Sequence, residues 1–451
     1  MSSVYKLFII FLFASSAWLS TVTPPFQSPD EFEHITRAYL LGQGEFVLGA
    51  PTGQSSGGQI DAGLNDYMNR FSSLPFHPER KLTISEIESA KTIEWTGNNE
   101  FKPALGMAYY FPAIYAVHTA GLFLGKYLDL SVDTSYRLTR ILLLLATCLI
   151  LYYSFLLYNP PALALGLLII PMSLFQFSSA SLDGIATVIA IFIISAFMRI
   201  RIDGEKSNPY LCPLMLLGWL LIASSRLQLF PMILLPIVAT IFYLRRPIFL
   251  VFVGFCAAFV IGWQIVIMKT IVDGRVKLGA TSSEIVTYYL QHPLSLIEVF
   301  VRTLTDEGRL RGFFSSFFGL LGWLDTPFTG KEYIYLLIII SFIFLLSLKS
   351  LKDRQSRLTA SLLLTVSIGA ITIVFLAMLV TWTPHPATLI EGIQGRYFLL
   401  PAILIAYALN NNLESSGFYR RILLFTILLL LGIYSFIITD QLLLDRYYLP
   451  S

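Results

Sequence analysis

Residues 4–37 read VYKLFIIFLFASSAWLSTVTPPFQSPDEFEHITR, an apolar run followed closely by a cluster of acidic and basic side chains. The run is about 19 residues long, enough to cross a bilayer, and Trp18 lies near its end, where aromatic side chains meet the membrane interface. We therefore predict a retained first transmembrane helix at 4–22. The alternative is a signal peptide, because Ala14–Ala17 resembles a cleavage site. Both interpretations place the chain from Pro24 onward outside the cytoplasm.

The whole chain has the composition of a polytopic helical membrane protein. Hydrophobic residues make up 55% of its 451 residues, charged residues make up 13%, and the mean hydropathy is +0.70. A soluble multidomain protein is excluded, and a net charge of +3 does not indicate a nucleic-acid partner. Cys148, Cys212 and Cys256 lie in apolar segments without metal-ligand spacing, so we expect them to be packing residues.

Ten further apolar segments predict an all-α integral membrane protein with about 11 transmembrane helices, within a range of about 10 to 12. They lie at 138–158, 161–177, 183–199, 210–224, 230–244, 247–270, 333–348, 358–381, 397–410 and 421–438. Short clusters of Lys and Arg separate them. Such clusters set the orientation of a membrane protein, because they favour the cytoplasmic side.

The stretch 103–125 decides the orientation of everything that follows it. It is apolar, but Pro112 and His118 interrupt it. If it does not cross the membrane, basic clusters such as Arg245–Arg246 share the cytoplasmic side with Lys6. We therefore predict helices that lie in, or re-enter, the outer leaflet. The alternative is that this stretch spans the membrane and another segment is miscounted.

The predicted organisation is a single polytopic membrane domain over 1–451. Its parts are a first transmembrane helix, an outer loop with juxtamembrane helices, a transmembrane bundle that contains a second large outer loop, and a short outer tail, at 4–22, 23–136, 137–438 with 271–332, and 439–451. Neither long loop has the composition of a disordered linker. Long ordered loops usually carry function.

The densest group of ionisable side chains lies at the start of the first outer loop. If a helix begins near Pro29, then Asp30, His34 and Arg37 follow an i, i+4, i+7 pattern and share one face, with Glu31 beside them. Two adjacent carboxylates with an imidazole and a guanidinium can supply a general base and a cationic partner for a phosphate. The cluster is therefore a candidate catalytic site.

Helix capping is the alternative explanation for the acidic residues. Asp30, Glu31 and Glu33 would then simply favour the positive end of the helix. Asp183, in a short polar patch between two apolar segments, is a second acidic candidate, and its alternative role is to cap the helix that follows. The spacing of these residues predicts no metal site.

Basic and aromatic residues at the predicted outer ends of the spans are candidates for substrate binding. Arg137 and Arg140 begin one span, and Arg396 with Tyr397 precedes another. A guanidinium at headgroup depth suits a phosphate, although such residues also serve as interfacial anchors. Trp323 is either a substrate platform or part of the interfacial aromatic belt.

The sequence at 24–37 resembles the opening signature of a bacterial membrane-protein family, domain of unknown function 2142. Ser181–Asp183, Gly322–Asp325 and Gln394–Pro401 resemble its later motifs in the same order, so the resemblance covers almost the whole chain. The family is similar in plan to the C-type glycosyltransferase (GT-C) superfamily. Members of that superfamily carry an acidic motif and interfacial helices in a first long outer loop, and a second acidic residue in the next outer loop.

The resemblance implies a GT-C-like fold and an enzyme that moves a sugar from a polyprenyl-phosphate donor to a cell-surface glycan, such as O-antigen or teichoic acid. The implied base is Asp30, with Glu31 positioning the acceptor and Asp183 assisting. The implied substrate-binding residues are His34, Arg37, Arg137, Arg140, Arg396, Tyr397, Trp323 and Asp325.

The expected partners are the lipid-linked donor, a glycan or lipid-linked glycan acceptor and the lipid bilayer, with no nucleic acid. The sequence identifies no definite cofactor, and a divalent cation (Mg²⁺ or Mn²⁺) is compatible with the chemistry. The expected location is the bacterial cytoplasmic (inner) membrane, with the active site facing the periplasm or cell exterior. Two alternatives stay open: an envelope-polysaccharide polymerase or ligase, and a transporter or flippase for lipid-linked sugars, although transporters usually place charges near the midplane of repeated halves.

Overall fold

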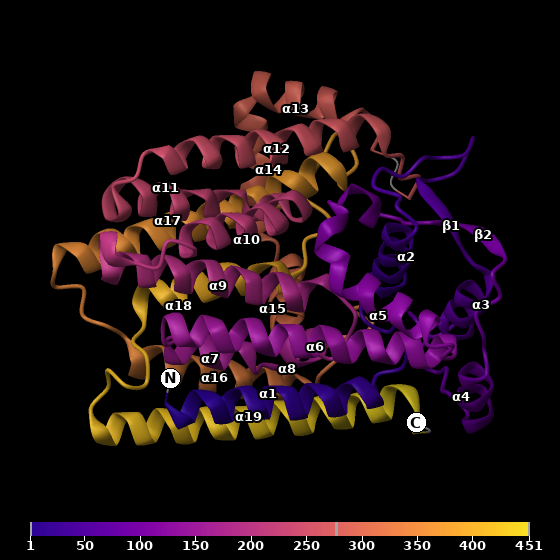
Figure 1. Ribbon diagram of the computed structural model, residues 1–451, viewed down its shortest axis with the longest axis horizontal. Helices are drawn as coiled ribbons and strands as arrows, with labels where there is room; N and C mark the ends of the chain where they lie inside the picture. The colour runs from indigo at the N-terminus through magenta and orange to yellow at the C-terminus, as the bar shows by residue number, and fades with distance from the viewer. Residues whose placement is uncertain (1, 276–277, 450–451) are drawn as a thin grey trace.

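Long apolar helices lie side by side along most of the molecule (Figure 1). The structure is a computed structural model that describes residues 2–275 and 278–449. Within these residues, 8 helices are long and apolar enough to cross a membrane. They are α1 (Ser3–Val22), α6 (Val132–Leu157), α9 with η3 (Leu182–Lys206), η4 with α11 and η5 (Leu227–Leu244), α12 (Ile248–Thr270), α16 (Gly330–Ser347), α17 (Arg354–Thr381) and α19 (Phe418–Tyr447). The prediction of an all-α membrane protein is confirmed at this level.

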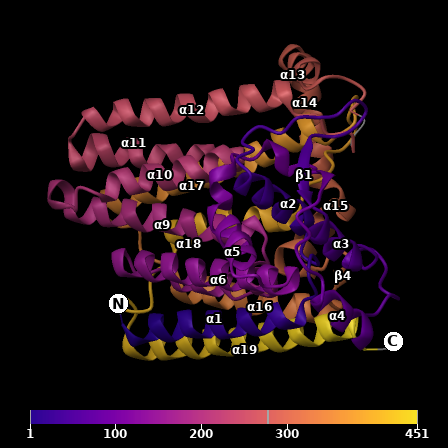
Figure 2. The same ribbon diagram turned by 45° about the vertical axis from the view of Figure 1, so that its right-hand side comes forward.

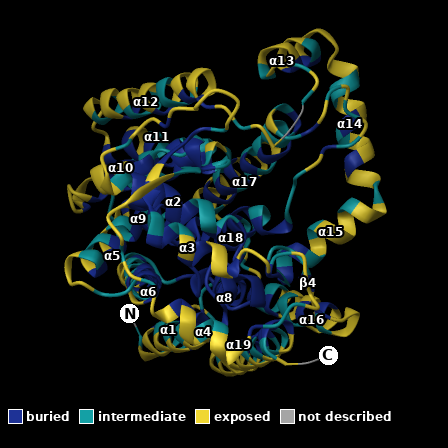
Figure 3. Cartoon of the chain, turned by 90° about the vertical axis from the view of Figure 1, so that its right-hand side faces the viewer, coloured by how far each residue is buried: buried dark blue, intermediate teal, exposed yellow. Residues whose placement is uncertain are grey.

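The burial of the helices fits a bundle in lipid. In α9, which is apolar on all sides, side chains such as Ile193 and Ile194 are fully buried. By contrast, Phe252 and Phe255 of α12 and Phe342 of α16 are exposed. Figure 3 shows the same division, with buried residues in the centre and exposed residues on peripheral helices such as α12 and α19. Large exposed apolar side chains on a helical bundle are expected where hydrocarbon replaces water.

Three predicted spans correspond to shorter helices. They are the pair α7 (Ala162–Leu168) and α8 (Pro171–Phe177), α10 (Leu211–Ser225), and α18 (Leu399–Leu409) with the preceding turn η6 (Gly395–Phe398). The prediction of one continuous helix at 161–177 is wrong, because the chain breaks before Pro171. A proline disfavours helical geometry in the residue before it and is well suited to the first helical turn.

The stretch 103–125 forms three short helical elements rather than one long helix. They are η1 (Met107–Tyr109), η2 (Pro112–Tyr115) and α5 (Ala116–Tyr127). With 12 residues, α5 is roughly 18 Å long and falls short of a hydrocarbon core of about 30 Å. It lies against α6, where a Cβ on Gly121 would come within 2.6 Å of the Cα of Thr139. The absence of a side chain therefore permits this close packing.

The two ends of the bundle differ in their polar contacts. The basic end is where α9 ends and where α17 and α19 begin. There Arg201 Nη1 donates to Thr359 Oγ1 (3.3 Å), and Lys349 Nζ donates to the carbonyl oxygen of Tyr407 (3.0 Å). The opposite end, which we call the α2 end, carries the first long loop with α2 (Glu31–Gly42), as Figure 2 shows.

The two long loops contain short helices and two antiparallel strand pairs. The first loop holds, besides α2, the elements β1 (Gly57–Asp61), α3 (Ala62–Phe71), α4 (Ile84–Lys91) and β2 (Asn99–Pro103). The second holds α13 (Ser282–Gln291), α14 (Pro293–Thr305), α15 (Glu307–Phe318), β3 (Leu320–Leu321) and β4 (Thr326–Pro327). β1 pairs with β2, and β3 pairs with β4. Both loops are thus ordered frames from which side chains can be positioned.

Candidate active site

Asp30 occupies an unusual backbone position just before α2. The helix begins at Glu31, so the prediction that Asp30 lies on the helical face with His34 and Arg37 is wrong. Asp30 is the N-cap residue, with a left-handed φ of 63°, and its carboxylate makes no capping hydrogen bond. Left-handed geometry at a residue other than glycine is strained and often marks a functional position. Capping therefore does not explain this carboxylate.

The carboxylate of Asp30 belongs to a chain of ion pairs that joins four distant segments. Arg396 Nη2 contacts Asp30 Oδ2 (3.1 Å), and Arg396 Nη1 contacts Asp183 Oδ2 (3.0 Å). The other oxygen of Asp183 pairs with Arg226, which lies between α10 and η4. We call Asp30, Asp183, Arg226 and Arg396 the Asp30 network. Its only side chain with substantial exposure is that of Asp30, at 29%, against 3% for Arg396 and 9% for Asp183.

A glycine allows Arg396 to reach this network. Gly395 donates its N–H to Ser316 Oγ of α15 (2.7 Å). A Cβ at Gly395 would come within 1.9 Å of the carbonyl oxygen of Phe313, so only glycine fits against α15 here. Asp183 lies in the first turn of α9, where Ser181 is the N-cap residue, so the predicted alternative of N-cap for Asp183 is wrong.

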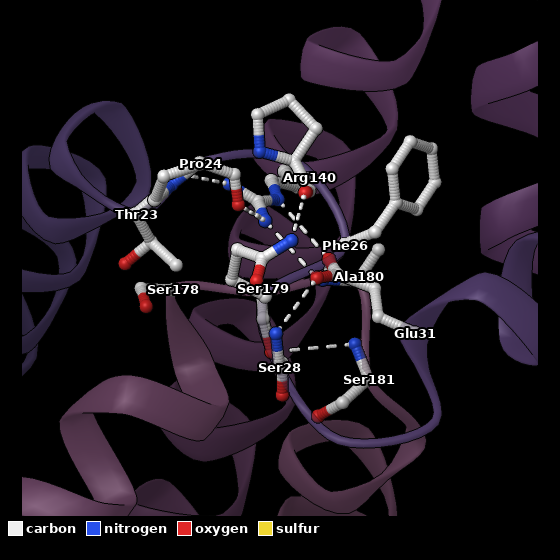
Figure 4. A network of polar contacts seen from close by, with 12 residues as sticks. Thr23, Pro24, Phe26, Ser28, Glu31, Arg140, Ser178, Ser179, Ala180 and Ser181 are labelled. Atoms are coloured by element: carbon white, nitrogen blue, oxygen red, sulfur yellow. Dashed lines mark hydrogen bonds and ion pairs between the residues drawn. The ribbon is translucent and has the colours of Figure 1, made fainter. Parts of the chain in front are cut away.

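Glu31 makes a second, sealed network beside the first (Figure 4). Its carboxylate accepts hydrogen bonds from Tyr136 Oη (2.7 Å), Arg140 Nε and Nη2 (both 3.1 Å) and the backbone N–H of Ala180 (2.6 Å). The backbone N–H of Ser28 adds a longer contact of 3.3 Å. A carboxylate has about four acceptor positions, so this one is saturated. We call Glu31, Tyr136 and Arg140 the Glu31 network.

Arg140 anchors the end of α1 as well as Glu31. Its guanidinium donates to the carbonyl oxygens of Ser20 (3.1 Å), Thr23 (2.9 Å) and Pro24 (3.1 Å). Both Arg140 and Glu31 are buried. All N–H donors of the Arg140 guanidinium are thus used to hold the α1–α2 connection against α6. This geometry gives Arg140 and Glu31 a structural role.

Two other predicted binding residues on α2 face the protein interior. His34 Nδ1 is 2.8 Å from Tyr115 Oη, and burial lowers the pKa of His34 to about 3, so the imidazole is neutral. The Arg37 guanidinium donates to the carbonyl oxygens of Glu45 (2.9 Å) and Phe46 (2.6 Å). These bonds fix the loop after α2, and they leave Arg37 engaged with backbone.

Arg137 lies apart from the Asp30 network. It pairs with Asp133 (2.8 Å), and Asp133 also accepts from Tyr67 Oη (2.6 Å). Arg137 lines a cavity of about 400 Å³ between the ends of α1 and α19, α4 and the start of α6. The residues that line this cavity include none of the Asp30 network.

The Trp323 and Asp325 pair fastens the two long loops together. Trp323 Nε1 donates to the carbonyl oxygen of Phe26 (2.9 Å). Asp325 accepts from the backbone N–H of Phe76 (2.7 Å) and from Arg446 Nη2 (3.2 Å) at the end of α19. These contacts join the two long loops and the end of α19, and they engage the polar groups of Trp323 and Asp325 with protein partners. Tyr397, in contrast, lies next to the network, with its ring 5.6 Å from the Arg396 guanidinium.

Sequence reasoning missed two residues of the site. Arg226 follows the apolar segment 210–224, and its only sequence signal was a cation at an outer span end. Glu33 was assigned to capping, yet its Oε2 atom is buried without a hydrogen-bond partner among the described residues. Among the same residues, no three His, Cys, Asp or Glu side chains are grouped as a metal site would require.

The chain belongs to the family described as "Predicted membrane protein (DUF2142)", which matches residues 11–406. The match includes the Asp30 and Glu31 networks but ends before α19 begins. Neither a curated protein nor a solved structure matches the chain.

Proposed function

We propose that this DUF2142 protein is a membrane glycosyltransferase. It moves a sugar from a polyprenyl-phosphate donor to a cell-surface glycan, such as O-antigen or teichoic acid, on the outer face of the cytoplasmic membrane. The observation that carries the proposal is Asp30, a partly exposed carboxylate held by the buried guanidinium of Arg396 where the helices of the bundle end. Such a carboxylate has the freedom to meet a substrate and the support to be held in place.

In the proposed reaction, Asp30 is the general base. The acceptor hydroxyl oxygen bonds to the anomeric carbon as its proton passes to the Asp30 carboxylate. The bond from that carbon to the phosphate oxygen breaks, and polyprenyl phosphate leaves with the electron pair. General-base catalysis typically contributes about 100- to 10,000-fold. Asp183 and Arg226 support the reaction indirectly, because they hold Arg396 in its position beside Asp30.

The arginines of the Asp30 network can stabilise the negative charge that develops on the leaving phosphate. Arg396 and Arg226 face two carboxylates, so the network itself is charge-balanced and can exchange partners with an incoming anion. The α2 end suits a lipid-linked donor, because the isoprenoid tail stays in hydrocarbon while the sugar reaches water. The sealed Glu31 network keeps Asp30 at this boundary.

The distribution of charges argues against transport as the function. No Asp, Glu, Lys or Arg occurs in 141–157 of α6, 184–198 of α9, 358–381 of α17 or 422–439 of α19. Transporters place ionisable residues near the bilayer midplane, because their substrate crosses there. Here the ion pairs with buried partners gather at the α2 end instead.

The proposed topology is GT-C-like, with about eleven crossings when α7–α8, α10 and α18 are counted with the long helices. The basic end then lies in the cytoplasm and the α2 end outside. Cysteine labelling in intact cells tests this arrangement. A cysteine at position 350, beside Lys349, should resist a membrane-impermeant thiol reagent until the cells are opened. Labelling of this cysteine in intact cells would reverse the orientation and remove the outward-facing site.

The function itself is tested by the chemistry of the cell surface. The surface glycans of cells with and without the gene are compared by composition and linkage analysis. The expected result is the loss of one sugar from an envelope glycan, with its polyprenyl-phosphate donor accumulating. Unchanged glycans together with a block in the movement of a lipid-linked sugar across the membrane would support the flippase instead.

A further inference from the structure

Glu33 is an ionisable group of the site that the proposed reaction does not use. It lies on α2, one helical turn after Asp30, and its Oε2 atom is buried without a hydrogen-bond partner among the described residues. A buried carboxyl oxygen without a partner is unfavourable, because it has lost its water and gained no hydrogen bond in return. Beside Asp30, such an oxygen is a candidate for contact with a ligand.

Among the residues that the structure describes, the cations that act on Glu33 are already occupied. The charged groups that act on it are Asp30 just before α2, Lys102 of β2 and Arg275 after α12. Lys102 Nζ donates to Asn65 Oδ1 (2.8 Å). Arg275 is held by Asp273, with its closest contact at 2.7 Å.

The position of Arg275 is also fixed by its surroundings. Its guanidinium lies over the ring of Trp382, 5.3 Å from the centroid. Its partner Asp273 accepts the backbone N–H of Gly106 (3.0 Å). A cation fixed in this way raises the local potential without forming an ion pair with Glu33.

These surroundings keep Glu33 largely neutral at mildly acidic pH and about half neutral near pH 7. Burial, followed by the charge of Asp30, raises the pKa of Glu33 to about 7. Below that pH the group is a carboxylic acid, which donates a hydrogen bond as well as accepting one. Glu33 and Asp30 therefore form a pair of carboxyl groups with different environments: Glu33 has a buried oxygen without a partner among the described residues, and Asp30 is held by an arginine.

The charges around the pair admit an anionic ligand most readily while Glu33 is neutral. Four cations (Lys102, Arg226, Arg275 and Arg396) then accompany four carboxylates (Asp30, Asp183, Asp273 and Glu100), a balance of 4 − 4 = 0 among the described residues. Ionisation of Glu33 makes this balance negative. It also places a second negative charge beside Asp30, which any anionic ligand would have to approach.

We propose that Glu33 is a substrate-binding residue, which donates a hydrogen bond from its neutral carboxyl group to an oxygen of the anionic lipid-linked phosphate donor. The identity of the ligand rests on the proposed function, whereas the neutral state of Glu33 does not. Ionisation of Glu33 then makes donor binding weaken as the pH rises, because the ionised form has no proton to donate and repels the phosphate.

The sign and size of the pH effect follow from the fraction of neutral Glu33. Binding is unaffected well below pH 7 and weakens as pH rises through 7. If only the neutral form binds, the apparent affinity is reduced by the neutral fraction, a loss of roughly 30-fold at pH 8.5. Glu33→Gln keeps a donor at this position without an ionisable proton, so its affinity should stay near the low-pH value of the unaltered protein.

The test has two measurements on the full-length protein in lipid nanodiscs. Infrared difference spectra of the unaltered protein against Glu33→Gln should show a protonated-carboxyl band that disappears with a midpoint near pH 7. Binding of undecaprenyl phosphate is then measured between pH 6 and 8.5 for both proteins. Their ratio at each pH cancels the ionisation of the phosphate itself, and it should change roughly 30-fold over this range.

Control variants separate this role from a structural one. Glu88→Gln, at an exposed carboxylate of α4, should follow the pH dependence of the unaltered protein. Glu33→Ala removes the donor and should bind the lipid phosphate weakly at every pH. The proposal is overturned if Glu33 is already ionised at pH 5, if the ratio of affinities is constant with pH, or if undecaprenyl phosphate does not bind. If only the transferase proposal is wrong, the infrared titration of Glu33 near pH 7 would still be observed.

Discussion

Asp30 and Glu31 are neighbours in the chain, yet they belong to networks of opposite character. Glu31 is completely buried, and its oxygens are saturated by Tyr136, Arg140 and backbone N–H groups. Asp30 has 29% of its side chain exposed and, among the described residues, forms an ion pair with Arg396. The comparison shows how one turn of the chain provides both a fixed anchor and an accessible carboxylate. In a lipid-boundary site, the anchor determines where the accessible group is held.

The sealed network should give the largest effect on stability when it is broken. Glu31→Gln leaves the buried Arg140 without a counter-charge, which typically costs about 3–5 kcal/mol. We expect a loss of that size in the free energy of unfolding, measured by chemical denaturation in detergent. Adding Arg140→Gln should recover part of it, because no unpaired charge remains. Equal stability of Glu31→Gln and the exposed control Glu88→Gln would contradict the assignment.

A substitution at Asp325 shows whether the effect of breaking the Glu31 network differs from that of breaking another contact between the loops. Asp325→Asn weakens the contact with Arg446 and with the backbone of Phe76, far along the chain from Glu31. We expect a loss of about 3 kcal/mol in the free energy of unfolding, the low end of the cost of breaking a buried ion pair, because Arg446 is also buried. Glycan transfer per folded molecule should be unchanged. A specific loss of transfer without a loss of stability would instead return Asp325 to the substrate-binding residues.

Arg396→Lys tests the Asp30 network. The lysine keeps the charge but cannot contact Asp30 and Asp183 together, as the guanidinium fork does. We expect affinity for undecaprenyl phosphate to fall by about tenfold, a difference of about 1.4 kcal/mol, with unfolding little changed. The matched control is Arg70→Lys on α3, an exposed arginine. Unaltered lipid-phosphate affinity in Arg396→Lys would separate this arginine from the donor.

The sequence was sufficient to predict the apolar helices and to locate the ionisable clusters. Hydropathy reports burial in lipid directly, and the cluster after α1 is dense enough to be noticed. Pro171 also offered a signal for the break between α7 and α8, but an uninterrupted apolar composition concealed it.

The pairing of the clusters could not be predicted. Arg396 and Asp30 are 366 positions apart, and Arg140 and Glu31 are 109 apart, so only the folded bundle determines which arginine meets which carboxylate. Spacing placed Asp30, His34 and Arg37 on one helical face, but the left-handed backbone at Asp30 begins the helix one residue later. Burial without a partner, which distinguishes Glu33, is likewise a tertiary property.

The most direct test of the account compares Asp30→Asn with Asp66→Asn, an exposed aspartate of α3. The measurement is transfer of the glycan sugar per molecule of correctly inserted protein, in cells that lack the native gene. Asp30→Asn keeps the shape of the side chain and removes the base, so transfer should fall by about 100- to 10,000-fold while insertion and folding are retained. Asp66→Asn should transfer normally. Near-normal transfer by Asp30→Asn would contradict the claim that this open carboxylate performs the chemistry.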